Sequence, residues 1–219
     1  DAYSDVGYGS VSTNPCGEII LSEYDSCRLI VVNLFSFVLN AFKDNSKFDW
    51  VSFESYVMKA QRLMDDLIDL EVEQIDKILA KIASDPESDE IKFREKNLWE
   101  RIKIACINGR RTGLGPTAVG DALAALGIVY GSPESINMTE KIYKALACGA
   151  YKSSIILAKE RGSFAVYDYD KEKNHKFISK VIGNLEDEYQ IMYRQYGRRN
   201  IALTTTAPTG SVSMMTQTS

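Results

Sequence analysis

Two short apolar runs, one near each end of the chain, constrain the fold most. Residues 29–35 form a continuous, largely β-branched run that predicts a strand buried on both faces, and residues 201–205 predict a second short strand. The segment between them, residues 36–200, is mostly helical in pattern. Two strands separated by a large helical excursion can lie in one sheet, so the sequence favours an α/β fold.

The intervening segment shows helical periodicity and clear start signals. Ser52 is the expected cap of a long amphipathic helix, and Ser132 with Pro133 marks the start of another. The glycines of residues 113–121 match no nucleotide-binding fingerprint, and we expect a tight helix–helix connection there. The expected helices span residues 53–83, 88–108, 122–126, 133–160, 175–182 and 185–196, and residues 19–21 form a short strand.

Composition excludes several classes of function. A net charge of −4 without a basic stripe argues against a nucleic-acid partner, and no apolar run is long enough to cross a membrane. The chain has 4 cysteines, no C-x-x-C pair and a single histidine, His175, so we expect no metal site. Asp65, Asp66 and Asp69 are interpreted as a solvated helix face. So few cysteines predict reduced thiols and a cytoplasmic location.

The run Asn-Pro-Cys-Gly-Glu at residues 14–18 is the first candidate for chemistry. Pro15 and Gly17 shape a loop around the thiol of Cys16, with the carboxylate of Glu18 beside it. Cys27 follows 11 residues after Cys16. A buried cysteine on an ordinary turn is the alternative, because free cysteine usually serves as a small apolar core residue.

A hydroxyl-rich turn follows the second predicted strand directly. Thr206, Thr209, Ser211 and Ser213 supply four hydroxyls, and Gly210 lies among them. A strand that ends in such a turn and leads into a helix presents N–H and O–H donors to one point, which suits a phosphate group. An ordinary Ser/Thr-rich turn remains the alternative.

Several motifs together, in their order, resemble the catalytic core of ribonucleotide reductase, most closely the adenosylcobalamin-dependent class II enzymes. The resemblance covers essentially the whole chain and implies part of a ten-stranded α/β barrel, with a finger loop that carries a thiol into its centre. The motifs are Asn-Pro-Cys-Gly-Glu at 14–18, Cys-Arg-Leu-x-x-x-Asn-Leu at 27–34, Arg-Arg-Thr-Gly-Leu-Gly at 110–115, Thr-Ala-Pro-Thr-Gly-Ser at 206–211 and Met-Thr-Gln-Thr-Ser at 215–219.

The resemblance also implies roles for individual residues. Cys16 matches the cysteine whose thiyl radical abstracts the 3′ hydrogen of the ribose, and Glu18 matches the carboxylate that takes the proton of the 3′-hydroxyl. Asn14 matches the amide that positions the ribose hydroxyls, and Cys27 matches one of two cysteines that reduce the 2′ position. The phosphate-gripping loop corresponds to Thr206, Ala207, Pro208, Thr209, Gly210 and Ser211.

Departures from the family pattern set the expected domain organisation. No cysteine precedes Cys16 as a partner for Cys27, and neither Cys106 nor Cys148 lies in a motif that would replace it. We therefore expect residues 1–219 to be a partial catalytic barrel domain, without the N-terminal effector region and first half, the C-terminal strands and the tail thiols. Such a segment should be inactive alone.

The resemblance implies adenosylcobalamin, with its cobalt, as cofactor and a ribonucleotide, as diphosphate or triphosphate, as substrate. The expected partners are the remaining segments of the reductase and a thioredoxin-type reductant, and a homodimer is left open. Three alternatives stay open: a class I large-subunit segment with a separate radical-generating subunit, a non-catalytic nucleotide-binding fragment, and an unrelated helical scaffold whose motifs match by chance.

Overall fold

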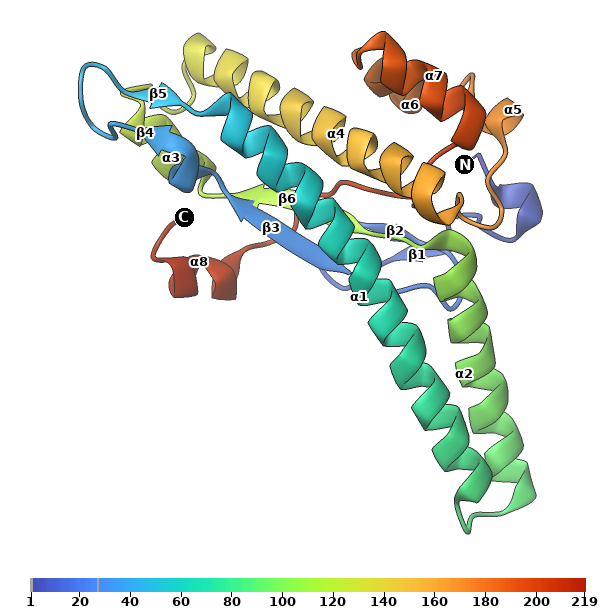
Figure 1. Cartoon of the computed structure of the whole chain (residues 1–219). Helices are drawn as coiled ribbons and strands as arrows, with labels where there is room; N and C mark the ends of the chain where they lie inside the picture. The colour runs from blue at the N-terminus through green and yellow to red at the C-terminus, as the bar shows by residue number, and fades with distance from the viewer. Residues whose placement is uncertain (1, 27) are drawn as a thin grey trace.

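The computed structural model describes residues 2–26 and 28–219 and combines long helices with a small parallel sheet (Figure 1). The elements, in chain order, are η1 Ser4–Val6, β1 Ser12–Thr13, β2 Ile20–Leu21, β3 Leu29–Asn33, η2 Leu34–Phe37, β4 Val38–Leu39, β5 Lys47–Phe48, α1 Trp50–Ser84, α2 Asp89–Gly109, β6 Gly113–Thr117, α3 Val119–Ala125, α4 Pro133–Arg161, α5 Tyr169–Glu172, α6 Lys176–Ile182, α7 Asp187–Tyr196 and α8 Gly210–Thr216.

The parallel sheet is built from β3, β6 and the extended segment 202–205. β3 pairs with β6 from Leu29 opposite Gly113 to Asn33 opposite Thr117. On its other side, β6 forms a parallel bridge between Leu114 and Thr204. The two strands predicted near the chain ends therefore do share one sheet, but β6 lies between them.

β6 corrects the prediction of a helix–helix connection over residues 113–121. A Cβ atom at Gly115 would lie 2.2 Å from the carbonyl oxygen of Thr205, and one at Gly113 would lie 2.9 Å from Thr205 Cγ2. Glycine is needed there because the neighbouring strand approaches too closely for any side chain. The glycine spacing marks a tightly packed central strand.

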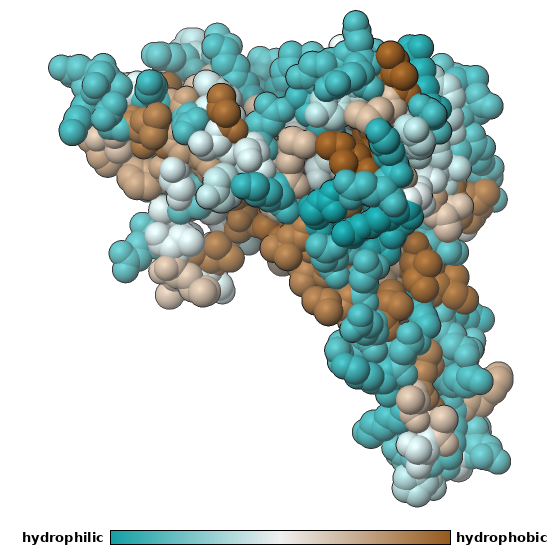
Figure 2. Space-filling view, viewed as in Figure 1, coloured by the Kyte–Doolittle hydropathy of each residue, from teal (hydrophilic) through white to brown (hydrophobic). Residues whose placement is uncertain are grey.

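Among the described residues β3 pairs only with β6, so it lies at the edge of the sheet, and the exposure of its side chains corrects the prediction that it is buried on both faces. Within β3 only Val32 is buried, and Leu29 is 41% exposed. Figure 2 shows an apolar band over this part of the molecule, and α1 also has exposed leucines. They are Leu63, Leu67 and Leu70.

α1 begins at Trp50, earlier than predicted, because Asp49 caps it instead of Ser52. The Asp49 carboxylate accepts the backbone N–H of Ser52 at 3.1 Å and the Ser52 hydroxyl at 2.8 Å. The first half of α1 packs on the sheet and on α4, and its second half pairs with α2 in a hairpin that projects from the body (Figure 1). The other long helix, α4, has the predicted cap, since Ser132 Oγ accepts the Ser135 N–H at 3.1 Å.

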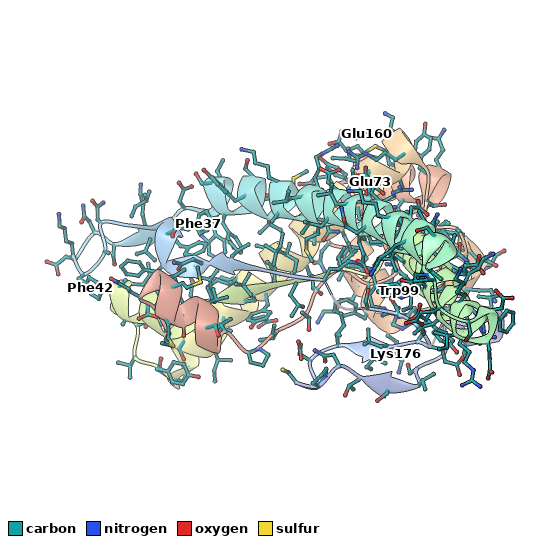
Figure 3. The ribbon with its side chains drawn as sticks, turned by 90° about the horizontal axis from the view of Figure 1, so that it is seen from below. Phe37, Phe42, Glu73, Trp99, Glu160 and Lys176 are labelled. Atoms are coloured by element: carbon teal, nitrogen blue, oxygen red, sulfur yellow. The ribbon has the colours of Figure 1, made fainter. Side chains whose placement is uncertain are left out.

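The main core lies between α1, α4 and the sheet. Figure 3 shows α1 on one side of the sheet and the β1–β2 hairpin on the other, so the two faces carry different layers. Among the buried side chains of this core are Phe53, Leu114, Leu146 and Ile155. The described residues contain no helix that is both long and apolar enough to cross a membrane.

Gly149 sets the distance between α1 and α4, and its replacement gives a direct test of this packing. A Cβ atom at this position would lie 2.9 Å from Val57 Cγ1. Gly149→Ala should lower the free energy of unfolding by about 1–3 kcal/mol, because overpacking forces the helices apart. Urea unfolding followed by circular dichroism measures the change. In a Val57→Ala background, Gly149→Ala should lower the free energy of unfolding by less. An equal loss in both backgrounds would contradict the close packing.

Asp65 corrects the interpretation of the three aspartates as a solvated face. Its side chain is fully buried and accepts from Arg110 at 2.7 Å, Arg161 at 3.2 Å and Arg199 at 3.3 Å. Burial alone would raise the pKa of Asp65, but the Arg110 guanidinium lowers it below its ordinary value. The described residues hold no group of three His, Cys, Asp or Glu side chains suited to a metal ion.

Candidate active site

Cys16 lies at the tip of the β1–β2 hairpin. The strands pair antiparallel, and the Asn14 N–H donates to the Ile19 carbonyl at 3.1 Å, which closes the loop at its base. The Gly17 N–H donates to the Asn14 carbonyl at 3.0 Å, and Gly17 has a φ of +79° that favours glycine. The Cys16 thiol is free and exposed on this shaped turn.

The side chain of Asn14 closes the loop with a hydrogen bond across the turn. Its side-chain oxygen accepts the N–H of Ile19 at 3.2 Å, so the carboxamide is held across the turn from Cys16. An oxygen used in this way leaves the amide NH₂ as the group that could donate to a ligand.

Glu18 lies two residues after Cys16 and is half-buried. Its Oε2 atom is shielded from solvent and has no hydrogen-bond partner within the part of the chain that the structure describes. Leaving a carboxylate oxygen buried and unpaired is costly, so such a group is suited to accept a hydrogen bond from a ligand. Glu18 could act in this way beside the Cys16 turn.

The hairpin and the hydroxyl-rich turn are joined by a single side chain. The Thr205 hydroxyl donates to the backbone carbonyl of Glu18 at 2.6 Å. Thr205 ends the third strand of the parallel sheet, and Thr206 begins the turn. The two stretches singled out in the sequence therefore meet at the carboxyl end of one strand, where open α/β sheets commonly bind ligands.

The turn itself, residues 206–211, leads into α8. Thr206 donates to the hydroxyl of Tyr143, on α4, at 3.3 Å, and Ala207 is buried. Pro208, Gly210 and Ser211 are exposed, and Thr209 is half-buried immediately before α8. Within α8 the Ser213 N–H bonds to the Thr209 carbonyl, and the first N–H groups of a helix lack such intrahelical partners. The backbone and side chains here offer donors to an anion.

Cys27 lies outside the described residues, so its predicted role stays a prediction. The other two thiols lie away from the Cys16 turn. Cys106 is buried and accepts from Arg28 at 3.0 Å, and burial raises the pKa of Cys106 to about 11. Burial also raises the pKa of Cys148, on α4. Both thiols therefore stay protonated near neutral pH and are weak nucleophiles.

The motif at residues 110–115 has a structural explanation. Arg110 bonds to buried Asp65, and Arg111 Nε bonds to Asp25 at 2.5 Å, close before β3. Thr112 is fully buried and donates to the Ala202 carbonyl at 3.0 Å, in the third strand. This motif thus fixes the sheet from which the candidate site is built.

Sequence reasoning missed two residues that position the site. Thr205 belongs to the strand that was predicted, but only its contact with Glu18 distinguishes it from Thr204. Tyr143 is one position in a long helix, and nothing in the sequence relates it to Thr206. Alternation of side chains along residues 201–205 is the signal that could have separated Thr205 from Thr204.

Comparison with known proteins gives the family of this chain. The family described as "Ribonucleotide reductase, barrel domain" matches residues 9–219. The chain belongs to the ribonucleotide reductase family. The predicted resemblance and the partial α/β barrel fold are both confirmed by this match.

Curated ribonucleotide reductases match nearly the whole chain. A protein named vitamin B12-dependent ribonucleoside-diphosphate reductase, from Mycobacterium tuberculosis, is 28% identical over 94% of this chain and 23% of its own length. A protein of the same name from Thermoplasma acidophilum is 30% identical over 93% of this chain and 20% of its own length. The chain therefore spans about a fifth of these reductases.

A solved structure supports the fold independently. The class Id ribonucleotide reductase alpha subunit of Actinobacillus ureae superposes with a TM-score of 0.62 at 21% identity. The superposition covers 98% of this chain and 32% of that subunit. At this identity the likeness shows the reductase barrel fold.

Proposed function

We propose that this chain is the central catalytic segment of a ribonucleotide reductase and acts in the reduction of ribonucleotides to 2′-deoxyribonucleotides for DNA synthesis. The observation that carries the proposal is the hydrogen bond from Thr205 to Glu18, which joins the thiol turn to the hydroxyl-rich turn. A module that binds only phosphate would need neither Cys16 nor Glu18. A ribonucleoside diphosphate is the substrate we favour, because the relatives from Mycobacterium tuberculosis and Thermoplasma acidophilum carry that name.

Each proposed site residue has one task. The thiyl radical of Cys16 takes the 3′ hydrogen atom of the ribose, while Glu18 accepts the 3′-hydroxyl proton. Asn14 donates to the ribose hydroxyls through its NH₂ group. The 2′-hydroxyl leaves as water with a proton from one of two thiols, Cys27 and a second cysteine, which together supply two electrons and two protons and end as a disulfide. Cys16 then returns the hydrogen atom to the 3′ carbon and regains its thiyl radical, and Glu18 returns the proton to the 3′ oxygen.

The substrate phosphates would lie on residues 206–211. Hydroxyl groups of Thr206, Thr209 and Ser211 and the first N–H groups of α8 are the donors we propose for them. The Thr206 hydroxyl has one proton and donates it to Tyr143 in the free chain, so it would have to turn from Tyr143 to the phosphate when a substrate binds. Ala207, Pro208 and Gly210 shape the turn and let its backbone approach the phosphate closely.

Adenosylcobalamin is the cofactor we propose, and the described residues fit only part of its requirements. They supply an exposed thiol on which the cofactor's radical chemistry can act. Two cavities among them, of 260 Å³ and 560 Å³, are lined by residues other than Cys16 and Glu18. We assign the corrin-binding surface to the remaining segments of the reductase.

We propose that residues 1–219 form a partial barrel domain that is inactive alone and is completed by those remaining segments. The free edge of β3 and the exposed leucines of α1 support this proposal. An open, apolar strand edge is normally paired with another strand or covered by another segment of protein. A thioredoxin-type reductant would renew the thiols of the whole enzyme. Reduced thiols and a cytoplasmic location belong to the same proposal.

Reconstitution tests the proposed function. The chain is joined to, or mixed with, the flanking segments of a related reductase, and ribonucleotide reduction is measured with and without adenosylcobalamin. We expect deoxyribonucleotide only when the cofactor and the other segments are both present. Turnover with a separate radical-generating subunit and no cobalamin would move the chain to class I. Nucleotide binding without turnover under every condition would favour a non-catalytic fragment.

A further inference from the structure

Thr205 is the residue that connects the two halves of the candidate site. Its hydroxyl reaches the Glu18 carbonyl at 2.6 Å, although the two residues are 187 positions apart in the sequence. Because the hydrogen bond is made to the backbone, it fixes the chain that carries the Glu18 carboxylate. It also fixes the turn around Cys16, which lies two residues earlier.

The position of Thr205 is set by the central strand β6. The Thr205 N–H donates to the Leu114 carbonyl at 3.0 Å. Its carbonyl and its methyl group occupy the space that side chains at Gly115 and Gly113 would fill. The third strand can therefore lie close enough to β6 for the Thr205 hydroxyl to reach the hairpin.

We propose that Thr205 is a positioning residue for ribonucleotide reduction, an inference that rests on the proposed function. It holds the Cys16 turn and the Glu18 carboxylate at a fixed distance from the phosphate-binding turn, which starts at the next residue. A nucleotide bound by its phosphates then presents its ribose to the thiol and the carboxylate together. Thr205 acts through Glu18 and does not itself contact the reacting atoms.

Two replacements separate the hydroxyl from the shape of the side chain. Thr205→Val keeps the branched shape and removes the donor, and Thr205→Ser keeps the donor. In the reconstituted reductase we expect Thr205→Val to lower kcat by roughly 10- to 100-fold, because small misplacements of reacting groups are costly. The KM for the nucleotide should change little. Thr205→Ser should restore most of kcat, and the matched control Thr204→Val should behave as wild type, since adjacent strand residues face opposite sides.

A second readout needs no turnover. Hydrogen exchange in the chain itself reports on the hairpin amides of Gly17 and Ile19, which are hydrogen-bonded in the loop. Loss of the hydrogen bond to the Glu18 carbonyl in Thr205→Val should speed the exchange of these amides by about threefold to tenfold. In Thr205→Ser the exchange rates should stay close to wild type. Gly115→Ala, which displaces Thr205 from β6, should give the same faster exchange.

The two readouts keep the inference distinct from the proposed function. Unchanged hairpin exchange in Thr205→Val would overturn the inference, as would a kcat that Thr205→Ser fails to restore. A wild-type reconstituted enzyme that never reduces ribonucleotides would instead contradict the proposed function, and hairpin exchange would still decide whether Thr205 holds the hairpin. Faster exchange together with a kcat loss reversed by serine supports the positioning role.

Discussion

Cys16→Ser in the reconstituted reductase should reduce ribonucleotide turnover to the background rate. An O–H bond is much stronger than an S–H bond, so a serine hydroxyl cannot take over hydrogen-atom transfer from the thiol. Cys16 lies exposed at the tip of a hairpin whose shape depends on Asn14 and Gly17, so the replacement should leave the fold intact. Formation of deoxyribonucleotide, separated by chromatography, is the measurement.

A matched cysteine replacement controls for general effects on thiols. Cys148 is half-buried in α4 and away from the hairpin, so Cys148→Ser should keep turnover near wild type. Nucleotide binding by Cys16→Ser should also stay near wild type, because the phosphate contacts that we propose lie on residues 206–211. Turnover that persists in Cys16→Ser would exclude the thiyl radical role.

Arg198→Met should destabilise the chain by about 3–5 kcal/mol, the usual cost of leaving a buried charge without its partner. Arg198 and Glu172 are both buried and form an ion pair, with an Arg198 Nη2 to Glu172 Oε1 distance of 2.5 Å. The hydroxyls of Tyr3 and Tyr193 each donate to the same carboxylate at 2.7 Å. This cluster ties the N-terminal segment to α5, α7 and the start of the third strand.

A double variant and an exposed pair provide the comparison. Arg198→Met combined with Glu172→Gln should recover part of the lost stability, because the neutral amide no longer needs a cation. Its oxygen can still accept from one tyrosine, and its NH₂ group can donate to the hydroxyl oxygen of the other. Arg94→Met, which breaks an exposed pair with Glu90, should change stability little. Urea unfolding measures all of these variants. Equal losses in the free energy of unfolding for Arg198→Met and Arg94→Met would contradict a stabilising role of the buried cluster.

The same cluster gives stability a defined pH dependence. Burial alone would raise the pKa of Glu172, but the charge and hydrogen bonds of Arg198 hold it below the ordinary value of 4.5. The ionised carboxylate therefore contributes fully above about pH 4.5, and its contribution is lost as the pH falls through the lower folded-state pKa. In this range the free energy of unfolding of Glu172→Gln should fall less steeply with decreasing pH than that of wild type.

Much of the fold could be predicted because its signals are local. The cap at Ser132 and the apolar periodicity of α1 and α4 depend on neighbours a few residues apart. β6 could not be predicted in the same way, since its glycines are explained by Thr205, far along the chain. The sequence predicts β3 as fully buried because an apolar run has the same pattern in a central strand and in an edge strand. We propose that other segments of the reductase pack on this edge strand.

In the candidate site, too, local features could be predicted and contacts between distant segments could not. Cys16, Glu18 and the turn at residues 206–211 could be found from residue type and order. Their meeting depends on the hydroxyl of Thr205, and that contact exists only because β6 brings the third strand close to the hairpin. The roles of the site residues stay predictions.

The strand order has a consequence for how the chain folds. Every pairing in the parallel sheet joins segments far apart in sequence, whereas α1 and α2 follow one another in the chain and pair as a hairpin. Sheets of this kind form slowly because long loops must close first. The third strand of this sheet is also the one whose threonine anchors the hairpin. The turn that carries Cys16 can therefore be anchored only after the third strand has joined β6.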